Sequence, residues 1–215
     1  MADLVFYTHP MSRGQTIRWM LEEVGEPYET RVLDYATTMK QEPYLSINPM
    51  GKVPAIVHEG KVVTEVAAIC CYLADAFPLA NLAPPPQGRA DYYRWIFFTS
   101  GPVEAAFSNK AAGWEPTPER QRMFGYGNYD LAINNLEKAL KGREYIAANH
   151  FTAADLFVGA NVNFMLAFNL LEPREVFVDY ARRMTDRPAY ERAKQIDAQL
   201  IADMQAAQPA QPQPA

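Results

Sequence analysis

The chain has 215 residues, of which 49% are hydrophobic and 21% are charged, and its formal net charge is −5 at pH 7. This length and composition suffice for one large folded domain or two small ones, and the negative charge argues against a nucleic-acid partner. No apolar run approaches the ~18 residues of a membrane span, and the first residues lack the pattern of a leader. We therefore expect a cytoplasmic protein without a membrane or nucleic-acid partner.

The first third of the chain predicts a small α/β layer. Residues 3–7 form a short apolar run that is typical of a buried strand. A helix follows, because apolar residues recur at helical spacing from Ile17 to Val24, and Gly25 is typical of a helix C-terminal cap. Residues 28–33 have the pattern of a second strand, and a right-handed crossover makes it parallel to the first.

The next elements complete this layer. Residues 41–48 predict a short helical turn or loop. Residues 54–58 and 61–63 predict two strands joined by the hairpin signal Glu59-Gly60, and residues 65–77 are apolar at helical spacing. The layer therefore contains about four strands and its helices.

Three prolines between Ala83 and Gly88 predict an extended connector, because they exclude a helix there. We therefore divide the chain into an α/β domain, a connector, an all-helical domain and a tail. Their predicted limits are residues 1–82, 83–88, 89–205 and 206–215. The tail is rich in Pro, Gln and Ala and is expected to be disordered.

Only helical patterns follow the connector, and the central one is apolar on nearly every side, as expected at the centre of a helical bundle. Thr152 and Asp155 have the spacing of a capping pair at its start, flanked by Phe151 and Leu156 as a hydrophobic staple. We assign this motif to folding rather than to catalysis. The predicted helices span residues 89–112, 117–141, 152–170, 174–185 and 188–204.

The cysteines and histidines do not have the spacing of a metal site. Cys70 and Cys71 are adjacent within a helical pattern, which fits neither a redox pair nor a zinc framework, so we expect inert core thiols. His9, His58 and His150 are scattered along the chain. We therefore predict no metal site.

Ser12 is the first candidate for chemistry, because it stands where the first helix begins. Gln15 follows three residues later, which is the pattern of a capping box. A hydroxyl has two acceptor pairs and one donor hydrogen, so a capping role leaves the donor for a ligand. The positive end of a helix suits an anion such as a thiolate.

Val53 and Pro54 are the second candidate. A proline cannot donate to a sheet ladder, so the backbone groups of the preceding residue stay open to a peptide-like ligand that adds as an extra strand. The alternative is an ordinary turn before an edge strand.

Glu65 and Val66, at the start of another predicted helix, are the third candidate. Backbone amides there can bind a ligand carboxylate while Glu65 receives an ammonium group. Lys40 and Lys52 are candidate partners for a second carboxylate, unless they are ordinary surface lysines.

These segments together resemble a cytosolic glutathione transferase of the bacterial serine type. The resemblance covers nearly the whole chain, from the turn at Ser12 and the segment Asn48–Ile56 to Glu65, the proline connector and the cap at Thr152. It implies a thioredoxin-like domain that binds glutathione, an all-helical C-terminal domain and a homodimer. It also implies conjugation of the glutathione thiolate to a small hydrophobic electrophile and a cis bond between Val53 and Pro54.

The resemblance also implies individual roles. Ser12 matches the residue that activates the thiol, with Tyr7 as the second choice, and Val53 matches the residue whose backbone holds the cysteinyl part of glutathione. Glu65 matches the acidic residue at the γ-glutamyl group. Val66 departs from the family, which usually has serine or threonine there, so we expect one hydrogen bond to glutathione to be missing.

The electrophile pocket is expected between the two domains, with Met11 on one side and Tyr93 and Phe97 of the first helix after the connector on the other. An aromatic stripe at helical spacing also fits an ordinary core. Two other functions stay open. One is a glutathione-dependent disulfide or peroxide reductase, and the other is a non-catalytic binding module, which the departure at Val66 keeps in consideration.

Overall fold

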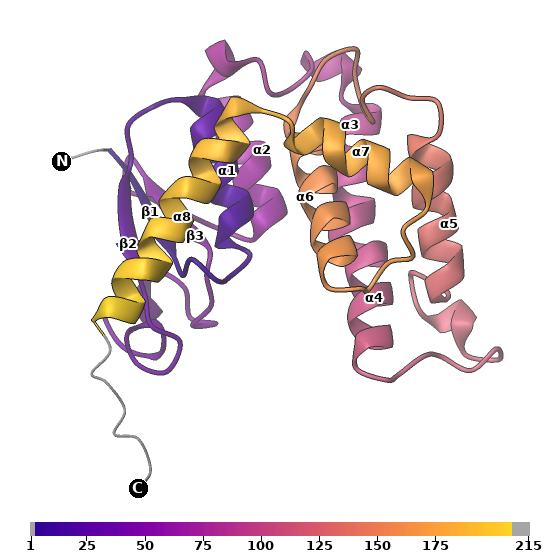
Figure 1. Ribbon diagram of the computed structural model, residues 1–215, viewed down its shortest axis with the longest axis horizontal. Coiled ribbons are helices and arrows are strands. Elements are labelled where there is room, and N and C mark those ends of the chain that lie inside the picture. Colours follow the sequence, from indigo (N-terminus) through magenta and orange to yellow (C-terminus); the bar gives the residue numbers. More distant parts are fainter. Residues whose placement is uncertain (1–2, 208–215) are drawn as a thin grey trace, which may run out of the picture. The chain divides into compact units, whose positions relative to one another are not determined.

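The apolar segments near the N-terminus form a four-stranded sheet in the order β2-β1-β3-β4 in the computed structural model, which describes residues 3–207. β1 is parallel to β2 and antiparallel to β3, and β4 is antiparallel to β3. Figure 1 labels the first three strands of this sheet. The predicted mixed sheet is thereby confirmed. Its strands are β1 (Leu4–Thr8), β2 (Glu29–Val32), β3 (Ala55–His58) and β4 (Lys61–Thr64).

Helix α1 (Gly14–Val24) follows β1 and buries the apolar face that its sequence spacing predicts. Ile17, Met20 and Leu21 are each at most 1% exposed. The helix ends at Gly25, whose φ of 79° is left-handed and whose N–H donates to the carbonyl of Leu21. The 3₁₀ turn η2 (Tyr44–Ser46) lies within the helical turn or loop predicted for residues 41–48, and another 3₁₀ turn, η1 (Thr38–Lys40), precedes it. Helix α2 (Val66–Ala76) follows β4.

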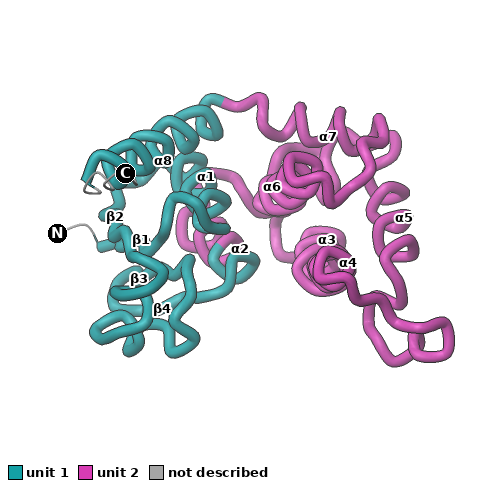
Figure 2. Tube along the Cα trace, turned by 60° about the horizontal axis from the view of Figure 1, so that its bottom comes forward, with its two compact units in different colours: residues 1–69, 188–215 teal, residues 70–187 magenta. Residues whose placement is uncertain are grey.

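The described residues divide into two compact units (Figure 2). The first unit comprises Met1–Ile69 with Pro188–Ala215, as far as these are described, and the second comprises Cys70–Arg187. The last helix, α8 (Pro188–Ala206), therefore lies in the unit that contains the sheet, where it packs on α1. This division by contacts differs from the division by sequence composition, and the domain limits stay a prediction. From residue 208 on, the predicted tail lies outside the described residues.

The second unit is helical, and α6 (Ala153–Ala167) is its most buried helix. The predicted capping box is confirmed, with Thr152 and Asp155 each bonded to the other's backbone. None of the helices within residues 3–207 is long and apolar enough to cross a membrane. The other elements of this part are η3 (Pro78–Ala80), η4 (Pro86–Gly88), α3 (Ala90–Phe98), η5 (Thr99–Val103), α4 (Glu104–Ala111), η6 (Gln121–Met123), α5 (Tyr129–Leu140) and α7 (Glu175–Thr185).

Two predicted helices have different limits in the structure. The helix predicted over 117–141 begins only at Tyr129, because Gly127 takes a left-handed φ of 67° and Asn128 is the true N-cap. The Asn128 side chain accepts a hydrogen bond from the N–H of Leu131 at 2.8 Å. The helix predicted over 89–112 is divided by the π-helical turn η5, which contains Pro102.

A buried cation connects the elements of the first unit. Arg18 of α1 is 1% exposed, and its Nε donates to Oδ1 of Asp197 on α8 at 3.2 Å. Its Nη1 donates to the Thr30 hydroxyl of β2 at 2.6 Å and to the Tyr28 hydroxyl at 3.1 Å. The guanidinium also lies 4.9 Å from the ring centre of Phe6 on β1. One side chain of α1 thus contacts two strands and a second helix.

Replacing Asp197 with alanine is expected to lower the free energy of unfolding by about 3–5 kcal/mol, because it leaves the charge of Arg18 buried beside an empty position. Urea denaturation measures this loss. The control is Arg192→Ala, which removes an ion pair between the same two helices, to Glu22, in which Arg192 is 52% exposed. Its cost is expected to be about 0–1 kcal/mol. Equal effects of the two substitutions would contradict a special role for Arg18.

Candidate functional site

Three of the predicted site segments lie at one end of the sheet. Tyr7 of β1 pairs with Ala55 of β3, and Ala55 pairs with Thr64 of β4. Adjacent strands are about 4.8 Å apart. The turn that follows β1, the residues that precede β3 and the residues that follow β4 are therefore neighbours. The fold brings the Ser12, Val53 and Glu65 segments together, all within the first unit.

Ser12 belongs to a hydrogen-bonded turn, and the predicted capping box at Ser12 is wrong. The helix begins at Gly14, and the Gln15 side chain donates to the carbonyl of Pro10 at 2.7 Å instead of reaching back to Ser12. The Ser12 hydroxyl accepts from the N–H of Gly14 at 2.9 Å and donates to the carbonyl of His9 at 2.7 Å. Its donor hydrogen therefore has a protein partner, with which a ligand has to compete.

Gly14 allows α1 to begin this close to the end of β1. A Cβ atom there would lie 2.0 Å from Oγ1 of Thr8 and 2.9 Å from Oγ of Ser12, far inside contact distance. Glycine is the one residue without that atom. The Ser12 turn is therefore held tightly between the strand and the helix.

The loop before β3 is held so that the backbone of Val53 stays open. The carbonyl of Lys52 accepts hydrogen bonds from the Asn48 side chain at 2.8 Å and from the Tyr44 hydroxyl. The bond between Val53 and Pro54 is cis, which confirms that expectation. Within residues 3–207, neither the N–H nor the C=O of Val53 has a backbone partner. These two groups are free to pair with an extended ligand.

The two candidate lysines differ in their surroundings. The Lys40 ammonium group donates to the carbonyl of Gly51, so it fixes the loop before Val53. Lys52 is exposed. Of the two, Lys52 is the better placed to meet a carboxylate.

Glu65 links β4 to α2 and has a backbone conformation that is uncommon for a residue with a side chain. Its φ is 68°, in the left-handed region, and its side chain is exposed. Such conformations gather at functional sites. The first turn of α2 begins at Val66, since the N–H of Ile69 donates to the carbonyl of Glu65 at 2.9 Å. The amides of this turn can bind an anion, but the Val66 side chain has no hydrogen to donate.

Tyr7 points away from the Ser12 turn. Successive side chains of a strand alternate between faces, and Thr8 faces Gly14 of α1. Tyr7 is 9% exposed and belongs to a core cluster with Met39, Tyr44 and Ala55 on the other face. This packing places the phenol of Tyr7 in the core instead of beside Ser12.

His9 and Tyr35 complete the Ser12 turn, and sequence patterns did not indicate either. His9 is 2% exposed, its carbonyl accepts the Ser12 hydroxyl, and its Nδ1 accepts the N–H of Met11 at 3.2 Å. The ring of Tyr35 lies 4.1 Å from the ring of His9. A histidine directly after a buried strand was the available signal for His9, whereas Tyr35 arrives from the loop after β2.

The residues predicted for the electrophile pocket are exposed. Met11 in the first unit is 62% exposed, and Tyr93 and Phe97 in the second are 40% and 62% exposed. Tyr92 and Trp95 of the same helix are buried instead, at 1% and 6%. The aromatic residues of α3 therefore divide into a core face and an exposed face.

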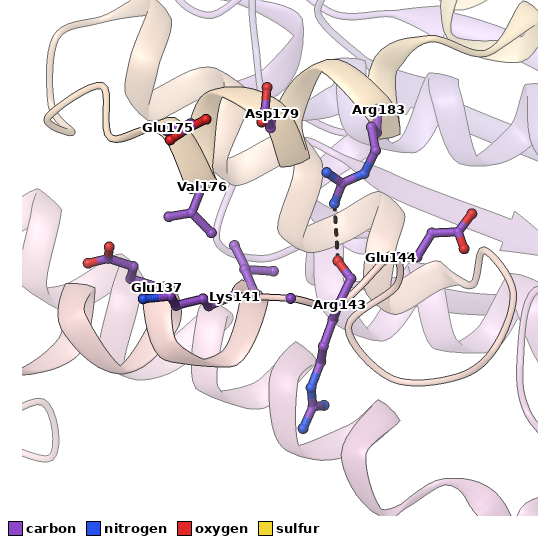
Figure 3. Close-up of a pocket in the computed structure, with 10 residues that line it drawn as sticks. Glu137, Lys141, Arg143, Glu144, Glu175, Val176, Asp179 and Arg183 are labelled. Atoms are coloured by element: carbon purple, nitrogen blue, oxygen red, sulfur yellow. Dashed lines mark hydrogen bonds between the residues drawn. The ribbon is translucent and has the colours of Figure 1, made fainter.

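A different hollow lies wholly within the second unit. This pocket of about 620 Å³ lies between α5, α7 and the segment that follows α5 (Figure 3). Charged side chains of both signs line it, and Arg183 donates to the carbonyl of Arg143 at 3.2 Å across its wall. None of the predicted site residues lines this pocket.

Burial raises the pKa of both Cys70 and Cys71, which is opposite to the change that makes a thiol reactive. Among the described residues, no three His, Cys, Asp or Glu side chains gather as a metal site.

Comparison with known proteins gives consistent matches. The glutathione S-transferase N-terminal domain matches residues 11–76. Glutathione S-transferase GST-4.5 of Xanthomonas campestris is 30% identical over 159 residues, which cover 71% of this chain and 78% of that protein. Two solved structures share the fold at 24% identity. The glutathione transferase of Methylococcus capsulatus has a TM-score of 0.73 and covers 91% of this chain and 99% of its own. The transferase URE2P6 of Phanerochaete chrysosporium, in complex with oxidised glutathione, has a TM-score of 0.72, and the match covers 93% of this chain and 98% of that protein's chain.

The His9 ring is expected to titrate below its ordinary pKa of 6.5, because burial disfavours its charged form more than Asp34 favours it. Its contribution to the free energy of unfolding is therefore complete above about pH 6.5 and is lost as the pH falls through the lowered pKa. NMR titration of the ring protons, with His9→Asn to assign the signal, measures this pKa. A midpoint at or above 6.5 would contradict the prediction.

Proposed function

Since the chain belongs to the glutathione S-transferase family, we propose that it is a serine-type transferase that conjugates the thiolate of glutathione to small hydrophobic electrophiles. The observation that carries this proposal is the meeting of the Ser12 turn, the open backbone of Val53 and the start of α2 at one end of the sheet. We further expect a cytoplasmic homodimer, as the resemblance implies.

The residues at this sheet end fit glutathione group by group. Its cysteinyl backbone is an extended peptide unit, which pairs with the N–H and C=O of Val53 before Pro54. Its γ-glutamyl carboxylate takes the amides at the start of α2 beginning with Val66, and its ammonium group takes the carboxylate of Glu65. Lys52 is exposed for the glycyl carboxylate.

Ser12 activates the thiol by hydrogen bonding to the thiolate. Lowering the pKa of a thiol from about 8.5 to roughly 6.5 requires about 2.7 kcal/mol of preference for the thiolate. A charged hydrogen bond of ~1.5–3 kcal/mol and a helix-end contribution of ~0.3–1 kcal/mol together supply it. The hydroxyl has to turn from the carbonyl of His9 toward the sulfur, while the N–H of Gly14 continues to hold its oxygen.

Catalysis then consists of thiolate formation and positioning. The thiol proton passes to solvent, a sulfur lone pair forms the bond to the electrophilic carbon, and the leaving group departs with its bonding electrons. Met11 is exposed directly after the strand and forms a wall of the electrophile site in this proposal. Tyr93 and Phe97 remain its predicted partners.

Ser12→Ala is expected to lower kcat/KM for conjugation by up to about 100-fold near pH 6.5, because about 2.7 kcal/mol corresponds to two factors of ten. A general aromatic electrophile serves as the second substrate, and the appearance of conjugate is followed spectroscopically. The matched control is Ser108→Ala on α4, where the serine is exposed. Tyr7→Phe tests the rival activator and is expected to lose much less activity.

Other results would contradict the role of Ser12 or favour one of the two alternative functions. Unchanged turnover in Ser12→Ala would exclude Ser12 as the activator. Disulfide or peroxide reduction without conjugation would favour the reductase. If calorimetry detects no binding of glutathione at millimolar concentration, the result would favour a non-catalytic binding module.

Val66→Thr is expected to tighten glutathione binding by about tenfold, because it restores a hydroxyl beside the γ-glutamyl carboxylate and one hydrogen bond to a charged group contributes ~1.5 kcal/mol or more. Isothermal calorimetry measures the Kd. Val62→Thr, the same change at an exposed position of β4, is the control and is expected to leave the Kd unchanged. Equal affinities of Val66→Thr and the wild type would show that the γ-glutamyl group binds elsewhere.

A further inference from the structure

His9 begins the turn that holds Ser12, and it binds this turn through both its backbone and its side chain. The carbonyl of His9 accepts the N–H of Ser12 at 3.0 Å and the hydroxyl of Ser12 at 2.7 Å. The imidazole Nδ1 accepts the N–H of Met11 at 3.2 Å. Pro10 has no N–H and is favoured at the second position of such a turn. One residue thus closes the turn twice, once through its carbonyl and once through its ring.

The ring of His9 is fixed in this position. The residue is 2% exposed, and its ring stacks on that of Tyr35 with centres 4.1 Å apart and an interplanar angle of 34°. The Tyr35 hydroxyl donates to the carbonyl of Met11 at 3.3 Å. Both backbone polar groups of Met11, the residue directly before Ser12, are therefore held by this pair of rings.

The bond to Met11 defines the protonation state of the ring. A backbone N–H can only donate, so Nδ1 has to offer its lone pair, and the hydrogen of the neutral imidazole is then on Nε2. Protonation would place a second hydrogen on Nδ1, directly against the N–H of Met11. The turn therefore keeps this bond only while His9 is neutral.

The thiol chemistry gives this bond a role. In the proposed function the Ser12 hydroxyl leaves the carbonyl of His9 to bind the thiolate, so the turn loses one of its bonds. The bond from Met11 to the imidazole and the bond from the Ser12 N–H to the carbonyl remain. They hold Oγ of Ser12 in place while its hydrogen turns toward the sulfur. The donor is thus already oriented when the thiolate forms.

We propose that His9 is a positioning residue for the thiol chemistry, whose neutral imidazole holds the backbone of Met11 and thereby keeps the Ser12 hydroxyl aimed at the sulfur of bound glutathione. This role rests on the proposed function of Ser12. His9 itself takes no proton from the thiol, because the thiol proton passes to solvent.

The groups around the ring keep it neutral near pH 7. Burial lowers the pKa of His9 by more than the charge of Asp34, in the loop after β2, raises it. The Thr37 hydroxyl and the N–H groups of Ala36 and Thr37 donate to the Asp34 carboxylate, which lowers its pKa and keeps it ionised. Burial raises the pKa of the Tyr35 phenol, so this ring stays uncharged. The positive start of α1 also disfavours a cation nearby.

Two substitutions separate the hydrogen bond from the ring. His9→Asn removes the ring and keeps an acceptor, because the side-chain oxygen of asparagine occupies the δ position of Nδ1. His9→Phe keeps a ring on Tyr35 and removes the acceptor. We expect His9→Phe to lower kcat for conjugation about three- to tenfold, the effect of one hydrogen bond. KM for glutathione is expected to stay unchanged, because Val53 and Glu65 still hold the ligand. His9→Asn is expected to retain most of kcat.

The matched control is His58→Asn. His58 pairs with Leu4, at the other end of the sheet from the Ser12 turn, and its replacement is expected to leave kcat unchanged. Urea denaturation of each variant separates lost stability from lost turnover. Activity that is kept by His9→Phe and lost in His9→Asn would overturn the proposal in favour of packing.

The acid side of the pH profile is the second readout. At saturating glutathione, protonation of the bound thiol lowers kcat/KM for the electrophile about tenfold per pH unit. Protonation of His9 adds a further loss in the wild type, so its profile is expected to steepen below the lowered pKa, whereas His9→Asn keeps the single slope. Circular dichroism at each pH confines the comparison to folded protein. Equal slopes for the two proteins would overturn the proposal.

A double substitution shows whether His9 acts through Ser12. In the Ser12→Ala background, His9→Phe is expected to cause no further loss, because the hydroxyl that His9 positions is gone. A further loss of the same size would overturn the proposal.

The proposed function and the role of His9 fail differently. If Ser12→Ala lowers turnover and His9→Phe leaves it at the wild-type value, the role of His9 is wrong and that of Ser12 stands. If Ser12→Ala itself keeps the wild-type turnover, the proposed function of Ser12 is wrong, and the role of His9 with it.

Discussion

The buried charge of Arg18 is the constraint on which the first unit depends. A guanidinium group removed from water is costly unless its donors find acceptors. The Nε and Nη1 of Arg18 find them on β2, on Tyr28 and on α8, whereas Nη2 has no hydrogen-bond partner among the described residues. The bonds of Nε and Nη1 therefore fix α1 relative to the sheet and to α8. The start of α1 carries the Ser12 turn, so the position of the candidate site follows from the same arrangement.

The site itself is defined by which polar groups the fold satisfies and which it leaves open. Asn48, Tyr44 and Lys40 bind the carbonyls of Lys52 and Gly51, so the loop is rigid up to Val53. The N–H and the C=O of Val53 are left without a backbone partner within the described residues. A loop that is anchored on one side and open on the other is organised before its ligand arrives, so little ordering entropy remains to be lost on binding.

Local patterns predicted much of this fold, because short-range spacing determines strands, helix faces and caps. The four strands, the apolar face of α1 and the cap at Thr152 and Asp155 are of this kind. Long-range partners were not predictable, since nothing near Arg18 in the sequence indicates Asp197, 179 positions later. Tyr35 was missed for the same reason. The predicted capping at Ser12 failed because the turn closes on the carbonyl of His9, which depends on the path of the chain through Pro10.

The pairing of α8 with α1 also bears on how the protein is made. A ribosome releases the chain from its N-terminus, and most domains fold in that order as they emerge. Here the sheet, α1 and Arg18 leave the ribosome first, while Asp197 belongs to the last helix. The helix that carries the partner of Arg18 is therefore made long after the strands and the helix that surround this cation, and Arg18 stays in water until α8 packs on α1.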